Sequence, residues 1–196
     1  MPRLVDHDAR RRELAHALWR VLRRDGLHAV SVRSVAAEAG WSAGALRHYF
    51  PSQDDLLGFA LELVIERATL RVRPLIAEAT GRDGALAVLA ELLPLDAERR
   101  EEFEVWQAFV VRAQVEPRLR PMRDAAEDAT RLGVGHAVRL LEEAGELASH
   151  RNAELETDRL YALVDGLALH GTVRLERYPP AALLAILTAH VDELTE

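Results

Sequence analysis

The basic side chains of this sequence are all arginine, and they are unevenly distributed along the chain. The 25 basic residues include no lysine, and 32 acidic residues give the 196-residue chain a formal net charge of −7. Residues 1–50 hold nine arginines and five acids (net +4), whereas residues 51–196 hold 16 arginines and 27 acids (net −11). A guanidinium group can bind two phosphate oxygens at once. The N-terminal segment is therefore a candidate for binding a polyanion such as nucleic acid.

Residue patterns typical of catalysis or metal binding are missing from residues 52–196. The whole chain has no cysteine, which excludes disulfides, thiolate zinc sites and cysteine nucleophiles. A helical metal-binding pair needs histidines three or four residues apart, and those of this region are far more widely spaced. Neither a glycine-rich phosphate loop nor a Gly-x-Ser-x-Gly turn occurs in it, and we expect the adjacent acids Glu101–Glu102 and Glu142–Glu143 to be solvated. The sequence predicts no catalytic residue, no metal and no cofactor.

The sequence contains no apolar run close to the roughly 20 residues of a membrane span. Asp6 and Asp8 lie where a signal peptide would have its apolar stretch. We therefore expect a cytoplasmic protein that makes no contact with a membrane.

Apolar residues recur at helical spacing along the whole chain. A first helix starts at Asp6 or Asp8 and ends before Gly26. No stretch alternates between apolar and polar residues as a strand would. The sequence thus predicts an all-α fold of nine helices, the other eight lying near residues 32–39, 42–49, 52–72, 83–93, 98–115, 121–144, 154–177 and 181–194.

Residues 31–50 have the spacing of a helix-turn-helix. Two short helices that cross tightly need a small side chain at the crossing, here Ala36, and a residue free to adopt positive φ in the turn, here Gly40. The second helix needs an apolar residue that packs on the first, here Leu46, while Trp41 fills the turn. The same spacing fits an ordinary pair of helices that binds no DNA. The basic character of residues 1–50 favours the DNA-binding interpretation.

The same region resembles the DNA-binding region of the TetR family of bacterial repressors. The matching stretches are Val35-Ala36-Ala37-Glu38-Ala39-Gly40-Trp41-Ser42-Ala43-Gly44, His48-Tyr49-Phe50 and Ser52-Gln53-Asp54-Asp55-Leu56-Leu57. The resemblance implies three DNA-binding helices followed by a helical body that binds a ligand and dimerises. The C-terminal part resembles the BetI-like branch of the family more loosely, at Leu93-Pro94-Leu95-Asp96, Trp106-Gln107-Ala108-Phe109, Glu116-Pro117 and Val164-Asp165-Gly166-Leu167-Ala168.

Two positions depart from the pattern of the family. Members usually carry Tyr where this chain has Arg47, and Lys where it has Gln53. The Lys of the family is a phosphate contact, so the neutral Gln53 is expected to weaken that contact. We hypothesise that the added charge of Arg47 compensates for it.

The second helix of a helix-turn-helix enters the major groove with its N-terminal residues toward the base edges. The candidate base readers, of which the two alanines suit thymine methyl groups, are Ser42, Ala43, Ala45 and Arg47. The candidate phosphate contacts are Ser31, Arg33, His48, Tyr49 and Gln53. Tyr49 fits a core position equally well, and Phe50 is assigned to the core. We expect residues 10–12, all arginine, to form a solvated first turn, with a DNA-contacting arm as the alternative.

We place the DNA-binding domain at residues 1–51 and a ligand-binding and dimerisation domain at residues 52–196. The second domain has aromatic and polar side chains on apolar helix faces, which would give a pocket a wall and orienting groups. These candidate ligand-binding residues are Phe103, Trp106, Gln107, Phe109, Arg112, His136, Asp165 and His170. Each also fits a core or interface position. An acid near aromatic rings suits a cationic ligand, and an arginine suits an acidic one. Both a cationic and an acidic effector therefore fit these residues.

The resemblance implies that the last two helices form the dimer surface. A stripe of small residues there would let another helix pack closely, and leucine and valine side chains add apolar area. The candidate interface residues are Leu163, Gly166, Leu167, Gly171, Leu183, Leu184, Leu187 and Val191. A two-fold dimer would present two recognition helices to a palindromic site.

Together these features predict a ligand-responsive, sequence-specific DNA-binding transcriptional regulator. The resemblance implies a repressor that binds a palindromic operator on double-stranded DNA as a homodimer and is released by a small-molecule effector; an activator fits the residues as well. The alternative from another class is an all-α small-molecule-binding protein or enzyme whose N-terminal helices do not bind DNA. A steep salt dependence of DNA affinity would distinguish the two.

Overall fold

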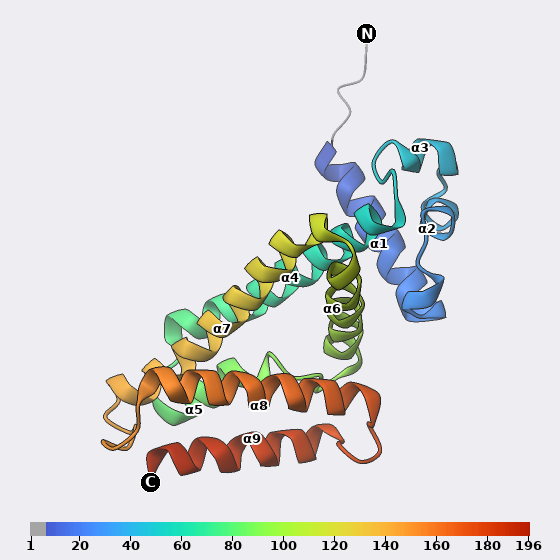
Figure 1. Cartoon of the computed structure of the whole chain (residues 1–196). Helices are drawn as coiled ribbons and strands as arrows, with labels where there is room; N and C mark the ends of the chain where they lie inside the picture. The colour runs from blue at the N-terminus through green and yellow to red at the C-terminus, as the bar shows by residue number, and fades with distance from the viewer. Residues whose placement is uncertain (1–6) are drawn as a thin grey trace. The chain divides into compact units, whose positions relative to one another are not determined.

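A computed structural model describes residues 7–196, with side chains from residue 9 onward. Within these residues the chain forms nine α-helices and two short 3-10 turns, and it contains no strand. The all-α prediction is confirmed; of the two proposed starts of the first helix, Asp6 lies outside the described residues. The helices are α1 (His7–Asp25), α2 (Val32–Ala39), α3 (Ala43–Arg47), α4 (Gln53–Glu78), α5 (Gly81–Ala90), α6 (Ala97–Val115), α7 (Arg120–Glu143), α8 (Ala153–Val173) and α9 (Pro180–Thr195) (Figure 1).

The chain divides into two compact units, Met1–Val64 and Ile65–Glu196, referred to below as unit 1 and unit 2. The long helix α4 contributes its first half to unit 1 and its second half to unit 2. α4 continues six residues beyond the predicted residue 72, although Pro74 removes one backbone hydrogen bond. The half-buried Leu75, which packs against the core of unit 2, favours this continuation.

In unit 1 the predicted helix-turn-helix is present, and its caps follow from the sequence. The Ser31 hydroxyl accepts from the Ser34 N–H, and the Ser34 hydroxyl accepts from the Ser31 N–H, which makes a capping box at the start of α2. Gly40 ends α2 at φ 71°, a conformation that favours glycine. Ser42 caps α3 through the Ala45 N–H. Caps at both ends of α2 and at the start of α3 help these short helices to form.

The core of unit 1 joins α1 to the helix-turn-helix. Leu14 and Leu18 of α1, Val35 of α2 and Leu46 of α3 are all fully buried. Ala36, also buried, provides the small side chain that lets α2 lie close to its neighbours. The inner face of α3 is therefore fixed by one leucine, and the remainder of this five-residue helix stays at the surface.

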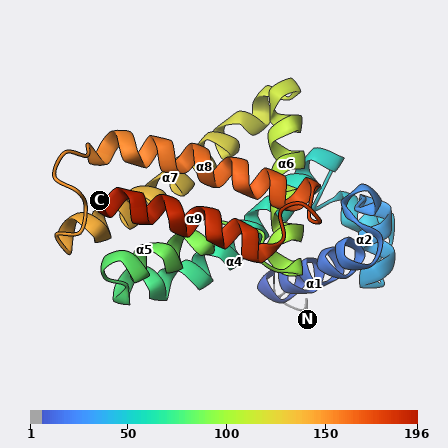
Figure 2. The same cartoon turned by 90° about the horizontal axis from the view of Figure 1, so that it is seen from below.

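In unit 2 the core is built from α5, α7, α8 and α9. α5 packs on α7, α7 on α8, and α8 on α9, and α8 and α9 lie antiparallel and side by side in both views (Figures 1 and 2). Gly171 permits this close approach, because a Cβ atom there would lie 2.5 Å from Leu183 Cδ1. α8 ends at Val173, four residues before the predicted end at residue 177, and turns connect it to Pro179.

Candidate nucleic-acid interface

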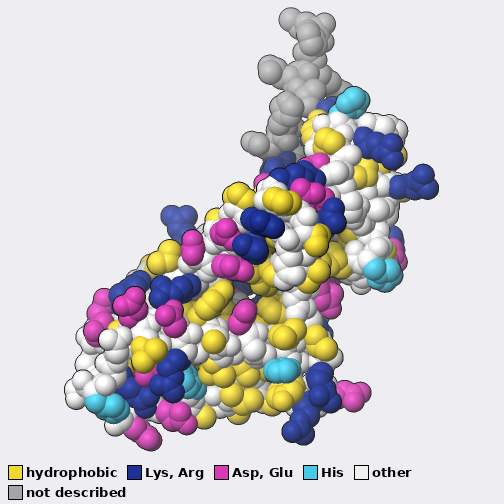
Figure 3. All heavy atoms as spheres, in the orientation of Figure 1, with side chains coloured by type: hydrophobic (Ala, Val, Ile, Leu, Met, Phe, Trp, Pro, Cys, Tyr) yellow, Lys and Arg dark blue, Asp and Glu magenta, His cyan; other side chains and the backbone are white. Residues whose placement is uncertain are grey.

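The outer surface of α3 carries the residues that the sequence singles out as base readers. Leu46 is buried against unit 1, whereas Ala45 and Arg47 are exposed and Ala43 is half-buried. Arginine side chains project from the part of unit 1 formed by α2 and α3 (Figure 3). The surface thus offers methyl groups next to a guanidinium group, which together can contact thymine methyls and guanine acceptors.

The arginines of unit 1 differ in whether an acid neutralises them. Arg20 and Arg24 of α1 both pair with Glu38 of α2, at 2.6 Å and 2.9 Å. Arg33 and Arg47 have no ion-pair or hydrogen-bond partner among the side chains described from residue 9 onward. These two guanidinium groups, on α2 and α3, are therefore available to phosphates or bases.

The one acid on α2 and α3, Glu38, is itself neutralised. The hydrogen bond from Arg20, followed by that from Arg24, lowers the pKa of the Glu38 carboxyl below its ordinary value. The same contacts join α1 to α2. Glu38 therefore remains ionised but is compensated by two guanidinium groups, which limits its repulsion of a polyanion.

Tyr49 is partly exposed and contacts two neighbouring side chains. The residue is 37% exposed, and its ring lies edge-on to Trp41, with the ring centroids 5.5 Å apart. Its hydroxyl accepts a hydrogen bond from Arg10 at 3.1 Å. The prediction that Arg10 is a solvated first-turn residue is therefore wrong, since its guanidinium is held against the aromatic pair.

The other candidate phosphate contacts have different surroundings. Gln53 is exposed, and its side-chain amide donates to the Val30 carbonyl at 2.5 Å, which ties the start of α4 to the segment before α2. The Ser31 hydroxyl is engaged in the cap of α2. His48 is exposed at the end of α3. Phe50, predicted as a core residue, is half-buried and packs on Phe59 with ring centroids 4.9 Å apart.

Residues Gly40–Gly44 also match the formula Gly-x-Ser-x-Gly, which in hydrolases marks a serine nucleophile. That turn connects a strand to a helix, whereas Ser42 lies between two helices. Its Oγ accepts the Ala45 N–H and caps α3. Ser42 therefore has the role of a helix cap.

The eight candidate ligand-binding residues of unit 2 have mixed environments. Phe109 is fully buried, the three candidates Phe103, Trp106 and Gln107 are half-buried, and Arg112 and Asp165 are exposed. His170 is exposed and stacks on Tyr178 at 5.1 Å. The half-buried His136 differs from the rest, because its Nε2 atom is buried and has no hydrogen-bond partner.

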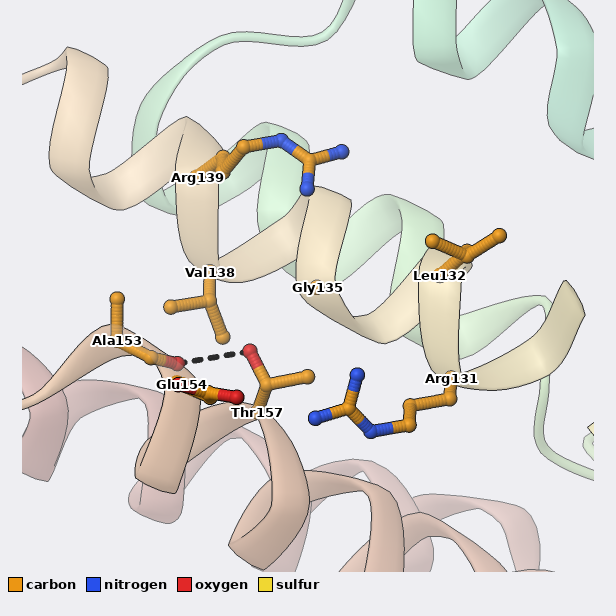
Figure 4. A pocket seen from close by; sticks show the side chains of 8 residues that line it. All are labelled: Arg131, Leu132, Gly135, Val138, Arg139, Ala153, Glu154 and Thr157. Carbon is orange, nitrogen blue, oxygen red and sulfur yellow. Dashed lines mark hydrogen bonds between the residues drawn. The ribbon is translucent and has the colours of Figure 1, made fainter. Parts of the chain in front are cut away.

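A cavity of about 190 Å³ lies elsewhere, between α7 and the start of α8. In Figure 4 the Arg131 guanidinium points toward Thr157, whose hydroxyl donates to the Ala153 carbonyl at 2.8 Å. None of the predicted ligand-binding residues lines it; the lining is Arg131, Leu132, Gly135, Val138, Arg139, Ala153, Glu154 and Thr157. The small residue Gly135 was the one available sign of space here. The cavity depends on how α7 meets α8, which the sequence does not specify.

Most of the candidate dimer residues belong to the core of unit 2. Five of the eight are buried within the chain itself: Leu167, Gly171, Leu183, Leu187 and Val191. Side chains buried in this way cannot contact a partner directly. Leu163 and Gly166 are half-buried, and Leu184 is 38% exposed.

One of the acids predicted to be solvated is buried in an ion pair. Glu102 is 4% exposed and binds Arg71 through two hydrogen bonds of 3.0 Å and 2.6 Å. Arg71 also donates to Glu91 at 2.9 Å. The expectation for Glu102 is wrong because Arg71, 31 residues earlier in the sequence, supplies the charge that makes its burial possible.

Two models of known protein families match parts of this chain. The family model described as "Bacterial regulatory proteins, tetR family" matches residues 14–58, and "BetI-type transcriptional repressor, C-terminal" matches residues 81–196. The HTH-type transcriptional regulator PksA of Bacillus subtilis is 37% identical over 195 residues, covering 99% of this chain and 94% of its own.

The chain belongs to the TetR family.

Solved structures agree with this assignment. A transcriptional regulator from Rhodococcus sp. Rha1 is 32% identical with a TM-score of 0.77, over 94% of this chain and 95% of its own. A regulator from Saccharomonospora viridis, solved with choline, shares the fold at a TM-score of 0.79 and 23% identity, over 94% and 96% of the two chains.

Membership in the TetR family identifies this protein as a DNA-binding transcriptional regulator, and the matched C-terminal region is of a repressor type. The helix-turn-helix described above is the matched DNA-binding region of the family. Among the helices of residues 7–196, none is both long and apolar enough to cross a membrane.

Proposed function

We propose that this TetR-family regulator represses transcription in the cytoplasm by binding a palindromic operator as a homodimer, and that a small-molecule effector releases it. In this proposal the DNA contacts come from residues 1–51 and from Gln53 at the start of α4, and the effector site and dimer surface come from the remainder of residues 52–196. The protein acts through binding alone, without catalysis.

The availability of Arg47 is the observation that carries the DNA-contact proposal. Arg47 is exposed on α3 beside Ala43 and Ala45, and no acid among the side chains described from residue 9 onward pairs with it. Arg47 would read a base together with Ser42 and the two alanines. Arg33, exposed on α2 and equally unpaired, would contact a phosphate and fix the register.

Contacts at the edge of the motif complete the proposed interface. The exposed His48 and the Tyr49 hydroxyl lie just after α3, where they can donate to phosphates. Gln53 and Ser31 lie at the starts of α4 and α2, whose N-terminal N–H groups attract anions.

The dimer surface that we propose is the outward face of α8 and α9. Apolar side chains are exposed along it, among them Leu169 and Val173 of α8 and Leu184 and Ile186 of α9. Gly166, three residues before Leu169 on α8, would let a partner helix approach closely. A two-fold axis through such a surface would present two copies of α3 to the two halves of a palindrome.

The proposed effector site lies in unit 2, next to His136. A buried nitrogen without a hydrogen-bond partner is energetically unfavourable, and a ligand that bonds to it would remove that cost. The half-buried Phe103, Trp106 and Gln107, together with Phe109, would supply apolar walls and one amide. An effector that binds the released state more tightly than the DNA-bound state would shift the population away from DNA.

Selection of bound fragments from a random DNA pool at near-physiological salt tests the proposal. Enrichment of an inverted repeat would support a sequence-specific dimer and would supply the operator for an effector screen. Enrichment of a single half-site would contradict the dimer, and failure to enrich any sequence would contradict specific binding. Sedimentation of the protein alone and with the enriched duplex independently gives the number of protein chains in the free oligomer and on each duplex.

A further inference from the structure

We propose that Arg10 of α1 is a positioning residue for DNA binding: its guanidinium holds Tyr49 and Trp41, and through them it fixes the C-terminal end of α3. This inference rests on the proposed role of α3 as the recognition helix. It adds a residue 39 positions away in the sequence from the Tyr49 that it holds.

Three contacts connect α1 to both ends of α3. The Arg10 guanidinium donates to the Tyr49 hydroxyl at 3.1 Å and lies over the Trp41 ring, 5.5 Å from its centroid. Trp41 in turn packs edge-on against Tyr49 and donates its indole N–H to Glu13 of α1 at 3.2 Å. Trp41 precedes α3 and Tyr49 follows it. α1 therefore holds the chain on either side of the recognition helix.

α3 needs such external support because it is very short. It has five residues, far fewer than the roughly 12–15 at which an isolated helix becomes marginally stable. Leu46 is its one buried side chain. One buried leucine fixes the depth of a helix but not its rotation about that contact, and the Arg10 contacts with Trp41 and Tyr49 supply further points of attachment.

The geometry favours positioning over a direct phosphate contact by Arg10. Its guanidinium face covers Trp41 and one of its N–H groups is bonded to Tyr49. By contrast, Arg33 and Arg47 keep all their donors available within the described residues. A phosphate contact by Arg10 would compete with the contacts that fix α3.

Hydrogen exchange of the DNA-free protein tests the inference without any assumption about the operator. The variant Arg10→Met keeps an apolar stem against Trp41 and loses the charge and the donors. We expect the amides of residues 43–50 to exchange about fivefold to tenfold faster in it, with α5–α9 unchanged. The matched control Arg11→Met removes an equal charge from the next residue, whose guanidinium binds Glu62. Unchanged exchange in Arg10→Met, or the same increase in Arg11→Met, would overturn the inference.

Binding to the selected operator gives the second readout. If Arg10 positions α3, we expect Arg10→Met to bind the operator about fivefold to tenfold more weakly. The slope of log affinity against log salt should be unchanged. A slope smaller by about 1 would instead show that Arg10 neutralises a phosphate, and would overturn the inference. The cycle formed by Arg10→Met, Tyr49→Phe and the double variant should be non-additive; additive losses would also overturn it.

Two further variants distinguish a folding defect of Arg10→Met, and a failure of the proposed function, from a failure of the inference about Arg10. If Arg10→Met does not fold, Tyr49→Phe removes only the hydroxyl that Arg10 holds and should show the same faster exchange at residues 43–50. Normal exchange there would overturn the inference. Arg47→Ala tests the proposed function alone: full operator affinity in this variant would contradict the base-reading role of α3, whereas the exchange result for Arg10→Met would stand.

Discussion

Arginine has opposite surroundings at two places, the surface of α2 and α3 in unit 1 and the ion pair of the buried Glu102 in unit 2. In unit 1, Arg33 and Arg47 are exposed and have no acidic partner among the described side chains. In unit 2, Arg71 lies between two acids, with hydrogen bonds to Glu102 and Glu91. One arrangement leaves the guanidinium donors to an external ligand, and the other uses them to join α4, α6 and the end of α5.

This difference shows that the neighbouring carboxylates, and not the residue type, decide what an arginine does. The acid-rich sequence of unit 2 supplies partners for Arg71, and also for Arg99, which binds Glu91 and Asp96. In unit 1 the one acid on α2, Glu38, binds Arg20 and Arg24. Among the side chains described from residue 9 onward, Arg33 on α2 and Arg47 on α3 have no partner.

The largest expected effect comes from breaking the buried pair of unit 2. Glu102→Gln leaves Arg71 with a neutral partner in a largely buried site, and removal of one member of such a pair is strongly destabilising. Because Arg71 is partly exposed and keeps Glu91, we expect the free energy of unfolding to fall by about 2–3 kcal/mol.

Denaturant unfolding measures this change. The control Glu142→Gln removes an exposed acid on α7 and should cost less than about 0.5 kcal/mol. Equal losses of unfolding free energy in the two variants would show that the Arg71–Glu102 pair stabilises the fold no more than a single surface charge does.

The next effect concerns the unpaired arginine of α3. Arg47→Ala should weaken operator binding by about 1–3 kcal/mol and relax the base preference at one position of each half-site. Fluorescence anisotropy with the selected duplex and its single-base variants measures both. Arg11→Ala, whose guanidinium is held by Glu62, should change neither the affinity nor the base preference appreciably. A similar loss of operator affinity in the two variants would show that pairing with an acid does not decide which arginines contact DNA.

A smaller effect is expected from introducing the lysine of the family at residue 53. Gln53→Lys adds a charge at the start of α4 and loses the hydrogen bond to the Val30 carbonyl. If the introduced ammonium group reaches a phosphate, the slope of log affinity against log salt should steepen by about 1. Gln53→Ala serves as the control because it loses the same hydrogen bond without adding charge. An unchanged slope in Gln53→Lys would mean that this position does not face the backbone of the operator.

The smallest expected effect concerns the half-buried His190 of unit 2. Burial, only partly opposed by Glu193, lowers the pKa of His190 below its ordinary value of 6.5. The unfolded chain then binds a proton near that pH while the folded chain does not. The stability from neutral His190 is complete above about pH 6.5 and is lost as the pH falls through the lower pKa of the folded protein.

The variant His190→Gln should therefore lose less thermal stability between about pH 7.5 and pH 5 than the parent protein. His150→Gln removes an exposed histidine and should follow the parent protein over the same range. Parallel curves for the parent protein and His190→Gln would show that protonation of this side chain does not influence folding.

The helices, and those helix ends that a capping residue marks, could be predicted because their signals are local. Ser31, Gly40 and Ser42 act on residues within one turn of themselves, and the structure has all three caps where the sequence places them. The end of α8 was less predictable, because no capping residue marks Val173 and the first strong break is Pro179.

The proposed dimer surface shows where local signals are insufficient. α9 has apolar residues on more than one face, so its sequence is equally compatible with Leu183 or Leu184 facing outward. The packing of α8 on α9 at Gly171 buries Leu183 and leaves Leu184 exposed. A sequence pattern measures how apolar a face is and contains no information on which neighbouring helix covers it.

By itself, the sequence determined the all-α fold, the helix-turn-helix with its caps, and membership in the TetR family, because these depend on spacings of a few residues. The tertiary structure decided which charges are available. Arg10 meets Tyr49 across 39 residues and Arg71 meets Glu102 across 31, so neither contact has a local signal. Burial and ion pairing are properties of the packed chain, and they separate the arginines paired within this protein from those that we propose contact DNA.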